Sequence, residues 1–228
     1  MIIHNLDMGF SRAYLIETEV GLYLIDAGMP GMHGKVLRFM QSIGRDDLKM
    51  IFLTHAHLDH YGSAKNIRDQ TGASIVIHSD DVEALKNGET RLGDVRGRGK
   101  YVKYLLPVLE RFYRLEPVEP DMIFEHGDRF DYFGLDALLI HLPGHTLGSS
   151  ALLTSEGHAF VGDLLSTSGK PHVQRYYASD WTQIKKSLLT LYTCQPSQIF
   201  PGHGSRPLSG DELKSMVELQ SNIRDYYE

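Results

Sequence analysis

The chain has 228 residues, of which 42% are hydrophobic and 23% are charged, as is typical of a folded globular protein. This length lies near the upper end of what one hydrophobic core supports, so we expect a single domain, 1–228. A formal net charge of −6 argues against a nucleic-acid partner, because binding phosphates requires a basic surface. Cys194 is the only cysteine, which excludes an intrachain disulfide and favours a reducing compartment. Without a signal-peptide pattern or a long apolar stretch, we expect a cytoplasmic location and no membrane partner.

The first part of the chain alternates short apolar runs with helical patterns. Strands are expected at 13–17, 22–26, 50–53 and 73–78, where aliphatic and aromatic residues cluster between turn residues. Helices are expected at 35–43, which Gly44 ends, and from Ala64 to about Thr71.

Residues 87–122 break this alternation, and we interpret them as an inserted helical cap. Four glycines precede an apolar run around Pro107, which predicts one kinked helix or two short ones. Between Arg91 and Lys103 the local charge balance is +4, which leaves −10 for the rest of the chain. Arg96, Arg98 and Lys100 are therefore candidates to bind an anionic part of a substrate, and a solvated loop is the alternative.

After the cap the strand pattern resumes. Strands are expected at 122–124, 129–133, 135–142, 149–154, 159–162 and 198–200. A helix at 181–192 has Asp180 and Gln183 as a capping box, and the last helix begins at Ser209 with Glu212 three residues on.

Four segments place metal-ligand side chains directly after apolar strands. The first contains three imidazoles and one carboxylate within six residues, and the other three each follow a strand that ends in glycine or Pro-Gly. Strands that end at one edge can direct these groups to a common point, where glycines let the backbone crowd around an ion. The candidate ligands are His55, His57, Asp59, His60, His145, Asp163 and His203.

The other histidines lack this setting. Alone, a histidine such as His145 is as readily a hydrogen-bonded loop residue as a ligand, but four such coincidences favour a metal site. We assign surface or structural roles to His4, His33, His78, His126, His158 and His172, and leave His141 open.

The pattern His55-x-His57-x-Asp59-His60, followed in order by His145, Asp163 and His203, resembles the metallo-β-lactamase superfamily over essentially the whole chain. The resemblance implies an α/β (α+β) fold, a four-layer αβ/βα sandwich with the metals at one edge. It also implies that His55, His57 and His145 hold one metal and that Asp59, His60 and His203 hold the other. Asp163 then bridges the two.

Details within the motifs narrow the branch. Zinc β-lactamases lack the bridging aspartate, so Asp163 argues against antibiotic hydrolysis. Diiron flavoproteins place a carboxylate where His57 stands, and an imidazole at that position suits zinc better. The segments 24–28 and 201–204 look most like the glyoxalase II and lactonase branches, and Asp26 becomes a candidate to orient a ligand histidine. Glyoxalase II carries a helical C-terminal extension, whereas only 25 residues follow His203 here, which puts its specific substrate in doubt.

The resulting hypothesis is a dinuclear hydrolase with two Zn²⁺ ions, with iron, manganese or mixed metals as alternatives. A metal-bridging hydroxide would cleave a small acyl substrate, a thioester or a lactone that is neutral or anionic. The leaving group would be neutralised by the second metal or by a proton from Asp59. Tyr61, Tyr176 and Tyr177 could offer hydroxyls to the substrate carbonyl, whereas Cys194 is expected to be buried and inert.

Three other readings remain open. A mononuclear iron dioxygenase of the persulfide-oxidising type would use only His55, His145 and Asp163, and metal analysis separates it from the hydrolase. An RNA-processing nuclease is disfavoured by the acidic charge, and a non-catalytic binding protein would have to retain the ligands without activity.

The apolar segment 101–115 could line an acyl pocket, cover the core or form a homodimer contact.

Overall fold

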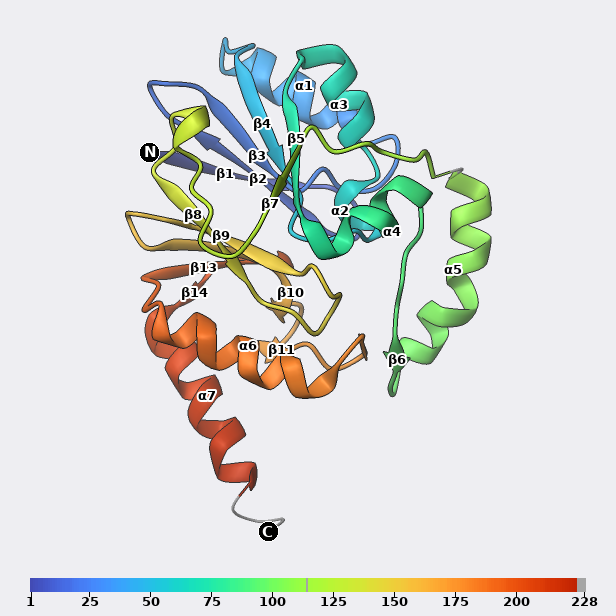
Figure 1. Ribbon diagram of the computed structural model, residues 1–228, viewed down its shortest axis with the longest axis vertical. Coiled ribbons are helices and arrows are strands. Elements are labelled where there is room, and N and C mark those ends of the chain that lie inside the picture. The colour runs from blue at the N-terminus through green and yellow to red at the C-terminus, as the bar shows by residue number, and fades with distance from the viewer. Residues whose placement is uncertain (114, 225–228) are drawn as a thin grey trace.

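The structure, a computed structural model, describes residues 1–113 and 115–224. Residue 114, inside the predicted cap, and residues 225–228 lie outside this description. Two six-stranded sheets face each other, and helices cover the outer face of each (Figure 1). This arrangement confirms the predicted four-layer sandwich.

The first sheet contains the N-terminal strands in the order β1-β2-β3-β4-β5-β7. The first three strands are antiparallel, and the pairs from β3 to β7 are parallel. The strands are β1 (Ile2–Asp7), β2 (Arg12–Glu17), β3 (Leu22–Ile25), β4 (Leu48–Phe52), β5 (Ser74–His78) and β7 (Met122–Phe124). Two helices on the outer face, α1 (His33–Ser42) and α3 (Ala64–Thr71), connect its parallel strands.

The second sheet has the order β14-β13-β10-β9-β8, with β11 paired to β10. Its strands are β8 (Ala137–His141), β9 (Ser150–Thr154), β10 (His158–Ser166), β11 (His172–Val173), β13 (Gln198–His203) and β14 (Leu208–Ser209). It is covered by α6 (Trp181–Thr193) and α7 (Gly210–Arg224).

Three layers of buried apolar side chains hold the sandwich together. Ile51 and Ile75 pack with α1 and α3 on one outside face, and Phe52 packs with Leu152 and Phe160 between the sheets. The third layer lies between the second sheet and the helices α6 and α7. This burial is the main source of stability, and it makes the strand ends a rigid platform for a site.

The predicted cap forms one continuous helix that contains Pro107, not two helices. The helix is α5 (Gly99–Tyr113), and the short strand β6 (Asp94–Val95) before it pairs with β12 (Tyr177–Ala178) of the second half. Before them lie the short helices α2 (Leu58–Tyr61), η1 (Ser79–Asp81) and α4 (Val82–Asn87).

Three sequence expectations need correction. Residues 129–133 do not form a strand: Arg129 makes one isolated bridge, and η2 (Asp131–Phe133) turns the chain at Gly134, which has a φ of +76°. The strand β1 was missed, because half of its residues are polar or charged and it borders solvent at the sheet edge. Strand β10 continues through Asp163 to Ser166, so this aspartate lies within a strand.

Candidate metal centre

All seven candidate ligands converge at one edge of the sandwich. Their ligand atoms form three overlapping groups, within each of which the atoms lie no more than 4.8 Å apart. The loop after β4 and helix α2 supply four of these residues, the β8–β9 loop supplies one, and β10 and β13 supply the last two. In that order they are His55, His57, Asp59, His60, His145, Asp163 and His203.

Three imidazoles form the first half of the cluster. His145 Nε2 lies 3.2 Å from His55 Nε2 and 3.0 Å from His57 Nδ1. Tetrahedral zinc with Zn–N bonds of about 2.05 Å separates neighbouring ligand nitrogens by about 3.3 Å. Both distances from His145 are therefore close to the spacing that ligands of one metal ion require.

Two carboxylates and two imidazoles form the second half. Asp163 Oδ1 lies 3.2 Å from His60 Nε2, and Asp163 Oδ2 lies 3.1 Å from His203 Nε2. Asp59 Oδ2 lies 3.5 Å from His203 Nε2 and 3.7 Å from His60 Nε2. Asp163 Oδ2 is also 3.4 Å from His145 Nε2, so one carboxylate borders both halves.

Two buried polar atoms in the cluster fit a cation. Among the described residues, His60 Nε2 and Asp163 Oδ1 are buried and make no hydrogen bond, because their 3.2 Å contact lacks hydrogen-bond geometry. Leaving such atoms unpaired is costly, and a metal ion held in the second half of the cluster would satisfy both. The donor set of imidazole nitrogens and carboxylate oxygens suits zinc, iron or manganese, so the residues fit a metal centre.

Glycines allow this crowding. A side chain at Gly202 would place its Cβ 2.6 Å from His60 and 2.7 Å from Asp163. Gly162 has a φ of +49°, and a Cβ there would meet Thr54 Oγ1 at 2.5 Å. Both positions therefore exclude any larger residue.

The histidine pKa values differ between the two halves of the cluster. Burial, together with the neighbouring imidazoles, lowers the pKa of His55 and lowers that of His145 to about 3. These imidazoles are therefore neutral, as metal ligands must be. At His203 burial acts in the same direction, but the carboxylates of Asp163 and Asp59 outweigh it and raise the pKa to about 9. The second half thus attracts positive charge.

Asp26 orients one of the ligands. Its Oδ2 accepts a hydrogen bond of 2.8 Å from His60 Nδ1, which leaves Nε2 directed into the cluster. Its Oδ1 accepts a second bond, of 2.9 Å, from the Thr54 backbone N–H. Such a carboxylate fixes the tautomer and rotation of a ligand histidine.

Asp81 was missed by the sequence analysis, although it joins both ligand loops. Its Oδ2 accepts hydrogen bonds of 2.8 Å from Ala56 N, between His55 and His57, and from Thr146 Oγ1, next to His145. Its Oδ1 accepts a bond of 2.8 Å from Gly148 N. The carboxylate is 3% exposed, so these bonds are shielded from water. Asp81 therefore positions the two loops relative to each other.

A cavity of about 200 Å³ opens beside the second half of the cluster. Its wall contains Asp163 and His203 together with serine, glutamine, histidine and tyrosine side chains. Of the predicted substrate residues, Tyr176 and Tyr177 lie in this wall. The Tyr177 ring is 5.3 Å from the His145 ring, and burial raises the pKa of its hydroxyl.

The remaining predicted substrate residues lie elsewhere. Tyr61 requires correction: it is 1% exposed and packs in the core beneath the first sheet, because helix α2 turns it away from His60. Arg96 lies over the Trp181 ring at 4.2 Å and pairs with Asp94 at 3.3 Å. Arg98 and Lys100 are exposed, and neither belongs to the cavity wall.

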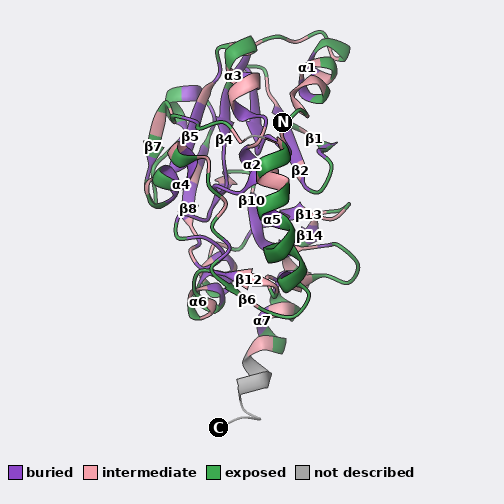
Figure 2. Ribbon diagram, turned by 90° about the vertical axis from the view of Figure 1, so that its right-hand side faces the viewer, coloured by how far each residue is buried: buried purple, intermediate pink, exposed green. Residues whose placement is uncertain are grey.

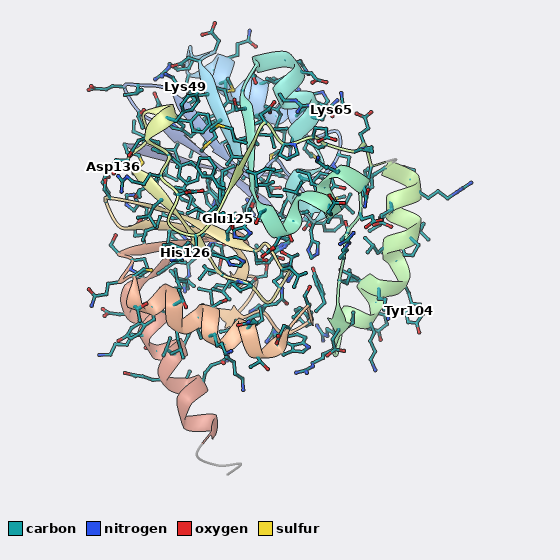
Figure 3. All side chains as sticks on the ribbon, in the orientation of Figure 1. Lys49, Lys65, Tyr104, Glu125, His126 and Asp136 are labelled. Atoms are coloured by element: carbon teal, nitrogen blue, oxygen red, sulfur yellow. The ribbon has the colours of Figure 1, made fainter. Side chains whose placement is uncertain are left out.

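The other polar groups have the following places. His78 is buried and stacks on His141 with ring centroids 3.8 Å apart, while the His126 ring accepts a hydrogen bond from the His141 backbone. Figure 3 shows His126 and its neighbour Glu125 beside the strands of both sheets. Cys194 is partly buried, and burial raises the pKa of its thiol, which makes it a poor nucleophile.

Comparison with known proteins agrees with this geometry. The family model described as the metallo-beta-lactamase superfamily matches residues 6–203. The chain therefore belongs to the metallo-β-lactamase superfamily, and it contains histidine and aspartate clusters that could hold metal ions.

Two curated proteins and one solved structure are similar to this chain. Hydroxyacylglutathione hydrolase GloC of Haemophilus influenzae is 29% identical over 215 residues, which cover 90% of each protein. Beta-lactamase-like protein 2 homolog of Drosophila melanogaster is 26% identical over 86% of this chain, which spans only 59% of that protein. The structure of TTHA1623 in a di-iron-bound form matches with a TM-score of 0.70 and 27% identity, over 95% of this chain and 98% of that one.

Proposed function

We propose that this protein is a dinuclear metal-dependent hydrolase that cleaves a small acyl substrate, a thioester or a lactone. The observation that carries the proposal is the placement of Asp163, whose two oxygens face ligand groups on both sides. A carboxylate in this position can bridge two ions. Similarity to hydroxyacylglutathione hydrolase GloC supports the thioester class.

Two bound metal ions would supply Lewis acidity and a water nucleophile near neutral pH. The protein itself contributes positioning and proton transfer. Asp59 is the most exposed carboxylate of the cluster, with 21% of its side chain accessible, so it can pass a proton to a leaving thiolate or alkoxide. The buried Tyr177 hydroxyl stays protonated and is available to donate a hydrogen bond to an acyl oxygen in the cavity.

The cavity also favours a substrate without a large anionic group. Among the described residues in its wall there is no lysine or arginine. A polyanionic thioester would therefore have to extend its charged end out of the cavity. This supports small neutral thioesters and lactones over large charged substrates, within the same class of reaction.

Metal analysis combined with a substrate screen tests the proposal. Protein purified without chelator should contain close to two metal ions per chain, and it should hydrolyse thioesters or lactones. We propose zinc as the metal, although the di-iron form of TTHA1623 makes iron the main competitor. One iron per chain, with oxygen consumption on a persulfide and no hydrolysis, would overturn the proposal in favour of the dioxygenase.

A further inference from the structure

Helix α5 exposes an apolar stripe to solvent. Tyr104 is 81% exposed and Phe112 is 77% exposed, and Figure 3 shows Tyr104 directed away from the body of the molecule. Figure 2 shows the helix at the front, with most of its length exposed. The stripe consists of Tyr101, Tyr104, Leu105, Val108 and Phe112.

The stripe is distinct from the face that attaches α5 to the protein. At 100° per residue, its five side chains fall within one arc of about 100°. Leu106, Leu109 and Tyr113 lie on a different side of the helix, and they pack with Leu58 and Tyr177. The stripe is therefore a second apolar face, which α5 does not need for attachment to the rest of the domain.

Basic side chains border the stripe on one side. Lys100 and Arg111 are 11 residues apart, close to three whole turns, so they project in nearly the same direction. Arg98 precedes the helix and Lys103 lies in its first turns, and both are exposed. This is the basic part of a chain whose net charge is otherwise strongly negative. The charge around α5 therefore favours an anionic partner.

We propose that the α5 stripe docks on an anionic phospholipid surface. A helix with aromatic and aliphatic side chains on one face and lysine or arginine beside it lies in the plane of a membrane interface. Tyrosines, such as the two in the stripe, favour the boundary between acyl chains and headgroups. Among the described residues no helix is long and apolar enough to cross a membrane.

A second copy of the chain fits this face less well. The stripe rises about 16 Å along the helix, and a strip of helix width covers on the order of 200 Å². A stable dimer needs roughly 800 Å² per partner. In an antiparallel pair the same flank of both helices meets, so Lys100 and Arg111 would face like charges.

Docking would bring lipid close to the metal centre. The inner face of α5 packs against Tyr177, whose ring lies 6.0 Å from the His57 ring. The inference does not depend on the proposed hydrolysis, because binding to vesicles is measured without substrate.

Co-sedimentation with vesicles tests this surface. We expect the protein to bind vesicles of phosphatidylglycerol and phosphatidylcholine in equal amounts, and to bind phosphatidylcholine alone far more weakly. Phe112→Ser and Tyr104→Ser should each weaken binding about tenfold, because each removes an apolar side chain that docking would bury in the lipid. Lys100→Gln and Arg111→Gln should each weaken it about fivefold, with a smaller effect at high salt.

Tyr132→Ser provides the matched control. Tyr132 lies in η2 and is 80% exposed, so this substitution changes a tyrosine of equal exposure outside α5. It should leave vesicle binding unchanged. Equal binding to both vesicle types, or an equal loss in Tyr132→Ser and Tyr104→Ser, would overturn the inference. A dimer in light scattering that Tyr104→Ser dissociates would identify the stripe as a subunit interface instead.

Discussion

Replacing Asp81 by asparagine tests how the two ligand loops are held together. The amide has a single acceptor oxygen, so either Ala56 N–H with the Thr146 hydroxyl or Gly148 N–H would face an NH₂ group. A buried donor without an acceptor costs about 1–3 kcal/mol, and loss of the negative charge weakens the surviving bonds by about 1 kcal/mol more. We expect Asp81→Asn to lower the free energy of unfolding by about 2–4 kcal/mol.

Urea denaturation of the metal-free protein, in the presence of chelator, measures this effect without a contribution from bound metal. Asp80→Asn is the control, because the Asp80 carboxylate is adjacent in sequence but 54% exposed. This substitution should change the free energy of unfolding by less than about 0.5 kcal/mol. Metal affinity of Asp81→Asn should also fall by about 10–100-fold. If the two variants unfold at the same urea concentration, Asp81 does not hold the loops as described.

Four further outcomes follow from the site and its surroundings. Asp163→Ala should reduce turnover by at least about 100-fold with a smaller change in KM, since even residues behind a ligand shift metal affinity by that order; unchanged turnover would remove Asp163 from the site. Glu212, whose pKa is lowered to about 2 by Arg206 and the Ser209 backbone, stabilises the start of α7 above pH 4.5. This contribution, about 1 kcal/mol or less at a partly exposed site, should fade as pH falls toward 2, and urea midpoints of Glu212→Gln should lack that component. Arg96→Ala should lower stability by about 0.5–1 kcal/mol through the lost contact with Trp181; a selective loss of activity on anionic substrates in kinetic assays would instead support Arg96 as a residue that binds an anionic part of the substrate. Chelation should lower the melting temperature in calorimetry, because at a metal concentration of 100 times Kd binding adds about 2.7 kcal/mol; an unchanged temperature would argue against metal binding to the folded state.

The candidate ligand positions could be predicted because each lies within a few residues of an apolar run in the sequence. His145 comes after a Pro-Gly turn, His203 is the last residue of β13, and His55 and His57 come directly after β4, so local sequence already places these four near strand ends. The capping box of the last helix is also local, and the structure has both of its hydrogen bonds, between Ser209 and Glu212. Patterns that span a few residues were thus sufficient for these features.

The support around the ligands could not be predicted, because it depends on long-range contacts. Asp81 bonds Gly148, 67 residues away, and no local pattern distinguishes it from the exposed Asp80 beside it. Tyr61 follows the motif directly, yet one step along α2 rotates it by about 100° and places it in the core. Nothing in the sequence indicates that Arg96 is engaged with another side chain, because its contact residue Trp181 is distant in sequence. Burial and pairing decide these roles, and both arise only on folding.

The metal centre lies where the two halves of the sandwich meet, which connects binding to folding. His55, His57 and His60 belong to the half built on the first sheet, while His145, Asp163 and His203 belong to the second. Asp81 also connects the two sheets of the sandwich, and it does so without a metal. It follows a strand of the first sheet, and its carboxylate accepts hydrogen bonds from Thr146 and Gly148 in a loop of the second sheet. Burying several imidazoles and carboxylates together is unfavourable unless a cation or protons balance them. A bound ion would therefore stabilise the site, and the sandwich in turn fixes the spacing of the candidate ligands.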